Sequence, residues 1–294
     1  MMTDTRASLQ HTIGLTGLLV IRLTDGDVRL HAVDGEDVVI RASEALEDVI
    51  VERGDGSVSI SPRAGRGEPD LDIDVPPAAS IVVETRSGDI VATGMTGDTR
   101  VTTASGDVRV DGVSGNVTVE AVSGDVTIAA PGAIDAKART VSGDLELRGG
   151  TLGRLGLATT SGDIILAGTF VGDGPFTVET VSGDTTITSV GPVRVEATTL
   201  TGDIHGPRAE DGPAKQAGRV VGVPGGPTIT FRSTSGDLSL SVEAVAIPVD
   251  QLPATGSGPG ETRVDPDLEI LRALERGDID VAEAAARMST LDAS

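Results

Sequence analysis

Eight aspartates recur at a near-constant spacing along this sequence, each as the third residue of a Ser/Thr-Gly-Asp tripeptide. They are Asp89, Asp107, Asp125, Asp144, Asp163, Asp184, Asp203 and Asp237. Carboxylates repeated at a steady spacing can line up along one edge of a repetitive fold, and calcium prefers such oxygen ligands. Alternatively, each carboxylate accepts hydrogen bonds from backbone amides of its own turn, as Asp commonly does in tight turns. In this second interpretation the row of aspartates, or aspartate ladder, is structural and binds no metal. Calcium binding is the alternative.

Other reactive groups are sparse, so we predict no catalytic residue, no cofactor and no enzyme activity. There is no cysteine, which excludes thiol catalysis, disulfides and Cys-ligated metal. The three histidines, His11, His31 and His205, form neither an HxH nor an HxxxH pair for a metal. A carbohydrate-active β-helix enzyme is the less favoured alternative, because the positions expected to face outward carry no aromatic side chain for a sugar ring.

The tripeptides mark an internal repeat that must position these aspartates. They begin at steps of 18, 18, 19, 19, 21, 19 and 34 residues, with further Gly-containing turns half-way between. Six, four and two residues before each tripeptide stand small or apolar residues, such as Thr99, Val101 and Thr103, with polar residues between them. Each unit therefore predicts two strands and two turns.

Strands of this length, repeated in register, predict an all-β protein of the β-solenoid (β-helix) class with about eight two-strand coils of 18–19 residues. Stacked coils would place matching residues about 4.8 Å apart. The glycine supplies the positive φ that the corner needs, and the inward Thr near the corner can satisfy backbone groups there. An antiparallel meander of hairpins would also alternate and is the alternative fold.

The rest of the chain departs from this period. Residues 1–75 are β in character without a fixed period, which predicts an irregular N-terminal β layer covering one end of the solenoid. The solenoid itself is predicted over 76–249, with an inserted Gly/Pro-rich loop at 205–228. Residues 250–264 have the composition of a linker, and 265–294 change to a helical period.

A helical hairpin over 265–294 would carry apolar residues for docking, namely Leu268, Leu271, Leu274, Met288 and Leu291. So short a segment cannot form a core by itself and should pack on something. Either it caps its own solenoid, or it recruits a protein partner or a second copy of the chain.

The charge balance narrows the partners and the location. The chain has 23 basic and 45 acidic residues, a formal charge of −22, and only three aromatic residues. A polyanion is repelled by nucleic-acid phosphates and anionic lipids, so we expect neither a nucleic-acid partner nor direct membrane insertion. The N-terminus has Asp4 before its apolar run and no long apolar core of a signal peptide, which predicts a cytoplasmic location.

The run VPPAASIVVETRSGDIVATGMTGDTRVTTASGDVRVDGVSGNVTVEAVSGDVTI resembles the bacterial "putative adhesin" β-strand-repeat family, a domain of unknown function allied to toast-rack domains. The resemblance covers roughly residues 18–249. The later run LEILRALERGDIDVAEAAARM is similar to a short two-helix module that accompanies some members. The resemblance implies a non-enzymatic solenoid, linked in some relatives to cell-envelope stress sensing or surface attachment.

We therefore predict a non-catalytic β-solenoid scaffold or interaction protein. Its partner would be another protein or a second copy, bound through the helical hairpin, with the 205–228 loop as a second contact. The alternative from another class is a self-assembling structural protein that polymerises end to end, as bactofilin-like solenoids do.

Overall fold

The computed structural model describes residues 8–43, 46–207 and 219–243. They form 22 strands and one short 3-10 helix, η1 (Leu46–Asp48), which confirms the all-β prediction for this part of the chain. All of these strands belong to one compact unit, Met1–Val245. Among these residues no helix is long and apolar enough to cross a membrane. The predicted linker at 250–264 and hairpin at 265–294, with Leu268, Leu271, Leu274, Met288 and Leu291, lie outside the described residues.

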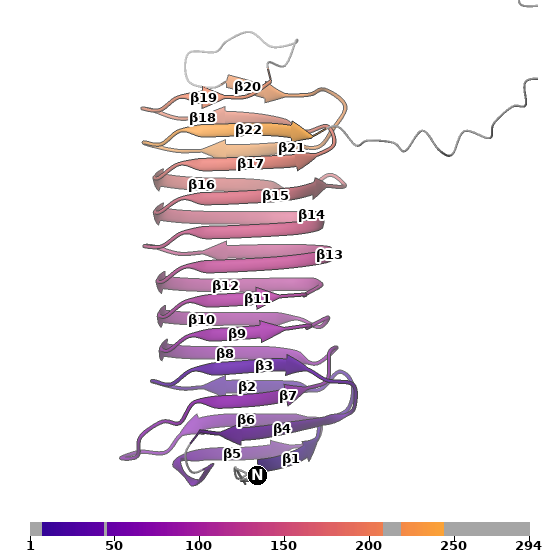
Figure 1. Ribbon diagram of the computed structural model, residues 1–294, viewed down its shortest axis with the longest axis vertical. Coiled ribbons are helices and arrows are strands. Elements are labelled where there is room, and N and C mark those ends of the chain that lie inside the picture. The colour runs from indigo at the N-terminus through magenta and orange to yellow at the C-terminus, as the bar shows by residue number, and fades with distance from the viewer. Residues whose placement is uncertain (1–7, 44–45, 208–218, 244–294) are drawn as a thin grey trace, which may run out of the picture. The chain divides into compact units, whose positions relative to one another are not determined.

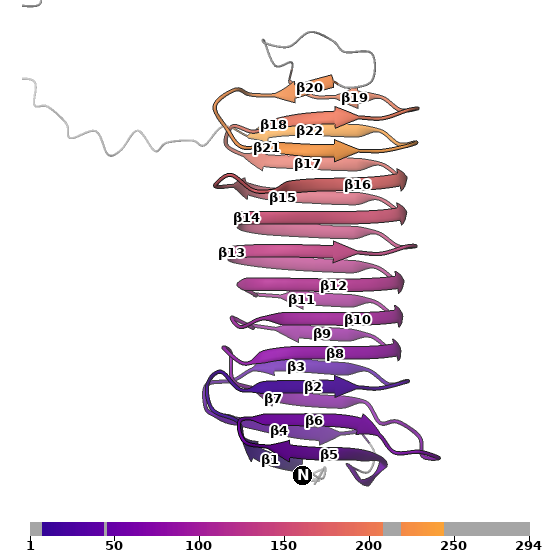
Figure 2. The ribbon, with the colours of Figure 1, turned by 180° about the vertical axis from the view of Figure 1, so that it is seen from behind.

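The strands stack into two sheets that face each other, and the chain passes from one to the other at each corner (Figures 1 and 2). The order in sheet 1 is β5 (Val49–Gly54), β6 (Ser57–Pro62), β2 (Leu18–Arg22), β8 (Ser80–Ser87), β10 (Thr99–Ser105), β12 (Gly115–Ser123), the second half of β13 (Val126–Arg139), the second half of β14 (Leu145–Ser161), β16 (Phe176–Ser182), β21 (Thr228–Arg232), β18 (Arg194–Thr198) and β20 (Arg219–Gly222).

Sheet 2 contains the other strand of each repeat. Its order is β1 (Ser8–Thr12), β4 (Asp37–Ala42), β7 (Leu71–Val75), β3 (Val28–Ala32), β9 (Ile90–Thr93), β11 (Val108–Asp111), the first halves of β13 and β14, β15 (Ile164–Phe170), β17 (Thr185–Val190), β22 (Leu238–Glu243) and β19 (Ile204–His205). β13 and β14 are long because each continues through the corner between the sheets.

Neighbouring repeats pair in parallel and in the register that the sequence alignment predicts. Thr99 of β10 lies between Ile81 of β8 and Val117 of β12, for example. The alternative of antiparallel hairpins is therefore wrong for the repeats. The inward positions form one continuous core, in which Val101, Val119 and similar side chains are fully buried. Each buried Val, Leu or Ile contributes about 1.5–3 kcal/mol of transfer free energy.

The strand order departs from the sequence order at the C-terminal end of the stack. β21 and β22, the last strands in the sequence, lie between the β16–β17 pair and the β18–β19 pair. The expectation that each unit stacks on the next is wrong here, because the chain skips one level and returns to fill it. The return buries Ile229 and Phe231 completely. The 205–228 segment, expected to be a loop, contributes β20, which pairs antiparallel with β18.

The N-terminal part shows a similar exchange. β2 and β3 pair in parallel with β8 and β9 on one side and with β6 and β7 on the other. Beyond them β1, β4 and β5 run antiparallel to their neighbours. Residues predicted as an irregular layer therefore extend the parallel stack before antiparallel strands end it.

Candidate functional site

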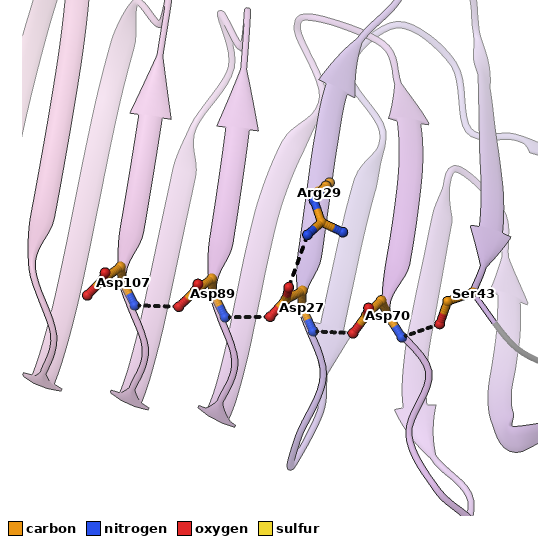
Figure 3. A network of polar contacts seen from close by, with 6 residues as sticks. All are labelled: Asp27, Arg29, Ser43, Asp70, Asp89 and Asp107. Carbon is orange, nitrogen blue, oxygen red and sulfur yellow. Dashed lines mark hydrogen bonds and ion pairs between the residues drawn. The ribbon is translucent and has the colours of Figure 1, made fainter.

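The turn aspartates form one continuous ladder along a corner of the stack. The amide N–H of each Asp donates to the Oδ1 of the Asp on the neighbouring level, at 2.8–3.0 Å, as between Asp107 and Asp89 (Figure 3). The order is Asp70, Asp27, Asp89, Asp107, Asp125, Asp144, Asp163, Asp184, Asp237 and Asp203. At the N-terminal end the amide of Asp70 donates to the Ser43 hydroxyl at 3.0 Å. All eight predicted aspartates are thus brought together.

Two features of the ladder correct the sequence interpretation. The carboxylates accept from the amide of the next level rather than from their own turn, because stacking places that amide directly beside each Oδ1. The ladder also follows the stack, so Asp237 comes before Asp203. Sequence reasoning missed Asp27 and Asp70. Asp27 had a signal, since it follows Gly26 in an Asp-Gly-Asp turn, whereas Asp70 follows a proline.

Glycine precedes every ladder aspartate except Asp70, because the backbones meet at this corner. Gly124 has a φ of +122°, and a Cβ there would lie 2.3 Å from the carbonyl oxygen of Gly106. The predicted role of the inward threonines is also visible. The Thr85 hydroxyl donates to the carbonyl of Ser87 at 2.9 Å, and Thr103 donates to Ser105 at 3.2 Å. Stacking therefore accounts for the glycine and the aspartate of the tripeptide. Thr85 and Thr103 hydrogen-bond within their own turns, whereas the hydroxyls of Thr180 and Thr199, at the same repeat position, have no partner among the described residues.

The described residues contain no group of three or more His, Cys, Asp or Glu side chains placed to hold a metal ion. Each shared ladder Oδ1 already accepts an amide N–H. Within the described ranges, the one histidine within 4.0 Å of a carboxylate oxygen is His31, whose Nε2 lies 3.9 Å from Asp72. The arrangement at the corner thus supports the backbone and offers no reactive group.

A charged cluster lies on the outer side of sheet 2 near its N-terminal end. The Arg41 guanidinium contacts Asp74 and lies 3.1 Å from an oxygen of Asp72. The hydrogen bond from Arg41 lowers the pKa of Asp74 below its usual value, and the same bond raises the pKa of Arg41. These groups hold β4 against β7 and have no unpaired member that suggests chemistry.

A shallow hollow of about 480 Å³ lies on the outer side of sheet 1, over β12, β13, β14 and β16. Its floor is the stretch of β14 that carries Gly156 and Ala158. Gly156 pairs with Lys137 on one side and Thr177 on the other, and Ala158 pairs with Arg139 and Glu179. A side chain is therefore missing or minimal on the middle strand, while both neighbouring strands carry longer ones. This difference creates the hollow.

The charges around the hollow are unequal on its two sides. Lys137 and Arg139 on β13 form one wall, and Thr177 and Glu179 on β16 form the other. Arg154 at one end is paired with Asp135, its Nη2 2.7 Å from a carboxylate oxygen. Lys137 and Arg139 make no ion pair within 4.0 Å among the described residues. On a chain of charge −22, two such cations beside an open floor are distinctive.

The sequence analysis did not single out this site, although a signal was present. The outward positions of the aligned units are mostly polar, yet in the unit before Ser161 they read Gly156 and Ala158. A gap in an otherwise polar row predicts a depression once the parallel register is known. The two small residues indicate a hollow only when the longer side chains beside them, on the neighbouring strands, are known.

Comparison with known families agrees with this geometry. The family model of the toast-rack domain, "Toastrack DUF4097", matches residues 43–241. The chain belongs to the toast-rack family. The match spans the whole hollow and every ladder aspartate except Asp27, and it confirms the family resemblance seen in the sequence. It ends before the C-terminal segment and gives no support for the accompanying two-helix module.

Solved structures resemble the toast-rack domain at low identity. A "putative adhesin" from Bacteroides fragilis is 13% identical, covers 82% of this chain and 98% of its own, and has a TM-score of 0.47. A "putative lipid binding protein" from Parabacteroides distasonis is 14% identical over 82% of this chain and 98% of its own, with a TM-score of 0.37. A "putative cell adhesion protein" from Clostridium sporogenes is 9% identical over 81% and 100%, with a TM-score of 0.26. No protein of curated function matches the chain.

Proposed function

We propose that this toast-rack protein is a non-catalytic recognition scaffold, whose stacked sheets hold a binding face rigid. The observation that carries the proposal is the hollow over Gly156 and Ala158, walled by Lys137 and Arg139 on one side and by Thr177 and Glu179 on the other. Here the outward positions of the middle strand carry no side chain or only a methyl group, and charged groups border the open floor. Binding sites are typically such concave regions with a few placed polar groups.

The rigid floor of the hollow favours ligand binding over catalysis. The floor strand β14 is hydrogen-bonded on both sides, to β13 and to β16. Its inward neighbours, Leu155 and Leu157, are buried in the core. A ligand would therefore meet a surface that is already formed, which reduces the entropy lost on binding. The hollow offers no pairing of a nucleophile with a histidine among its lining residues.

End-to-end assembly has less support in the described strands. The last strands of both sheets at the N-terminal end, β1 and β5, pair antiparallel with their neighbours, and β5 exposes Glu52 and Arg53. At the other end β20 is antiparallel and β19 has two residues. Short, charged or antiparallel edges discourage the addition of further strands.

A matched pair of variants tests the recognition role. Gly156 on β14 and Ile165 on β15 belong to the same turn of the stack, but they lie on opposite outer faces. Gly156→Arg fills the hollow, and Ile165→Arg adds the same charge elsewhere. Wild type and both variants would be screened against arrays of peptides and oligosaccharides. We expect ligands that bind wild type and Ile165→Arg but not Gly156→Arg. Equal binding patterns in all three proteins would contradict the proposal.

Two parts of the sequence interpretation stay predictions. The link to cell-envelope stress depends on family resemblance, and growth of a deletion strain under cell-wall stress would test it. The cytoplasmic location is the other, and cell fractionation would test it.

A further inference from the structure

We propose that the hollow binds an extended peptide segment of a partner protein, with acidic side chains toward Lys137 and Arg139 and a basic or hydroxyl side chain toward Thr177 and Glu179. This inference rests on the proposed recognition function and names its ligand. It follows from the width of the hollow, the spacing of its charges and the chemistry of its two walls.

The width fits one polypeptide chain. The walls stand on β13 and β16, which both pair with β14, so they are two inter-strand spacings apart, about 10 Å. Gly156 and Ala158 leave the space above β14 open between them. An extended chain lying along β14 would have its backbone about one strand spacing from either wall. Because β14 already has both of its partners, such a chain would be held by side chains and would not join the sheet.

The spacing along the walls matches an extended peptide. Lys137 and Arg139 are two residues apart on one strand and both point outward, so their Cα atoms are about 7 Å apart. Alternate side chains of an extended peptide repeat at the same distance. Acidic residues at positions i and i+2 of the ligand would each meet one cation. Position i+1 would point at the other wall, where the one ion pair of Glu179 in the described part of the chain is with Arg232, at 4.0 Å between largely exposed groups.

Neighbouring charges decide which contacts matter most. Glu120 on β12 lies directly across from Arg139 and competes with a ligand for its charge. Lys137 has Thr118 in the corresponding position, so it is the less encumbered cation. Arg154 is already paired with Asp135. We therefore expect Lys137 to contribute more to binding than Arg139.

The surroundings favour a peptide over a glycan. None of the residues that line the hollow is aromatic, so a sugar ring has no face to stack on. Val141 and Val181, 50% and 49% exposed, continue the two walls toward the aspartate corner. They offer apolar contact to an aliphatic residue that follows the acidic pair. An acidic oligosaccharide is the other ligand that could meet the two cations, so the test must distinguish its binding from that of a peptide.

The test measures binding of short peptides to the full chain by fluorescence anisotropy. The probe is a labelled Glu-Lys-Glu-Thr-Val peptide, compared with Glu-Glu-Glu-Thr-Val, Gln-Lys-Gln-Thr-Val and Lys-Glu-Lys-Thr-Val. We expect the first to bind most tightly, by about fivefold over the second and by more than that over the third, which loses both acidic side chains, since an exposed ion pair contributes up to about 1 kcal/mol. Tightest binding of the all-acidic peptide would show a non-specific basic patch and overturn the inference.

Variants separate this inference from the proposed function. Lys137→Ala should weaken the probe about fivefold and Gly156→Arg should abolish its binding, whereas Ile165→Arg should leave it unchanged. Unchanged circular dichroism and melting temperature would show that each variant folds. If trigalacturonate binds, is lost in Gly156→Arg, and no peptide binds, the peptide inference fails and the recognition function stands. If Gly156→Arg alters no binding at all, both fail.

Discussion

The aspartate corner and the hollow over β14 both depend on glycine, but for opposite reasons. At the corner Gly124 has a positive φ and faces the carbonyl of Gly106, so no side chain fits. In the hollow Gly156 lies in ordinary strand geometry, and a Cβ there would meet only Thr177 Oγ1 at 3.6 Å and Lys137 Cγ at 3.8 Å. The first glycine is required by the stack. The second is dispensable for folding, and its lack of a side chain leaves room for a ligand.

This difference separates residues that the fold requires from residues that are free to form a binding site. The corner repeats the same residues at every level because each level must accept the next. The hollow occurs where the repeat is broken on the outer face, at no cost to pairing. In a repetitive protein, regular positions therefore report stability, and irregular outward positions are the better guide to a site.

The largest effect is expected for Gly124→Ala. It forces a side chain into a left-handed backbone region and against a backbone carbonyl 2.3 Å away, so it should lower the free energy of unfolding by about 3 kcal/mol or more. Urea titration followed by circular dichroism would measure it. Gly132→Ala, at the other corner, is the control, because its nearest neighbour is Ser114 Cβ at 3.9 Å. Similar losses of unfolding free energy in the two variants would show that the glycine of the aspartate corner has no special structural role.

A smaller loss is expected for Asp125→Ala in the middle of the ladder. It removes the acceptor of the Asp144 amide and should lower the free energy of unfolding by about 1–2 kcal/mol, since water can partly replace the carboxylate at this exposed corner. Asp125→Asn keeps an acceptor oxygen and relieves repulsion between neighbouring carboxylates, so it should cost less than about 0.5 kcal/mol. An equal loss in both would mean that the charge, and not the acceptor, stabilises the ladder.

Gly156→Ala should act in the opposite direction. It reduces the entropy of the unfolded chain and meets no close contact, so the free energy of unfolding should rise by about 0.5–1 kcal/mol. The same urea titration measures this gain, and peptide affinity should fall in the same protein. Destabilisation as large as that of Gly124→Ala would show that the floor of the hollow is a structural requirement after all.

The smallest effect concerns the charged cluster on sheet 2. The hydrogen bond from Arg41 lowers the pKa of Asp74 in the folded state, so the unfolded state binds a proton more readily as pH falls. The stabilisation is complete above the unfolded pKa near 4 and is lost as pH falls through the lower folded pKa. Because both side chains are partly exposed, Asp74→Asn should cost about 0.5 kcal/mol at pH 7.

Titrating unfolding from pH 7 to pH 2 checks this prediction. The stability difference between wild type and Asp74→Asn should shrink as the pH falls. A difference that stays constant over that range would show that Asp74 acts through packing, and that pairing on the outer faces contributes less than the corner hydrogen bonds do.

Much of the repeat could be predicted from single residues and their spacing. Val101 and Val119 alternate with polar residues, which fixed the inward face, and Gly-Asp at each turn fixed the corner. These features are local, because each depends on one strand or one turn. Asp70 and the hollow could not be found in this way, since Asp70 lacks the tripeptide, and the two walls and the floor of the hollow come from three different strands.

The sequence by itself determined the two-strand repeat, the buried face of each strand and which residues could occupy the corner, because strand alternation and turn chemistry act within about twenty residues. Only the tertiary structure decided that β21 and β22 lie between the β16–β17 pair and the β18–β19 pair, so that Asp203 follows Asp237 in the ladder. It also decided that Gly156 lies between Lys137 and Thr177. The physical reason is that stacked repeats have nearly interchangeable edges. Which strand edges pair depends on the length of the connecting segments and on the apolar surface that is buried when the chain returns to an earlier level. Neither quantity can be read from the sequence of one repeat.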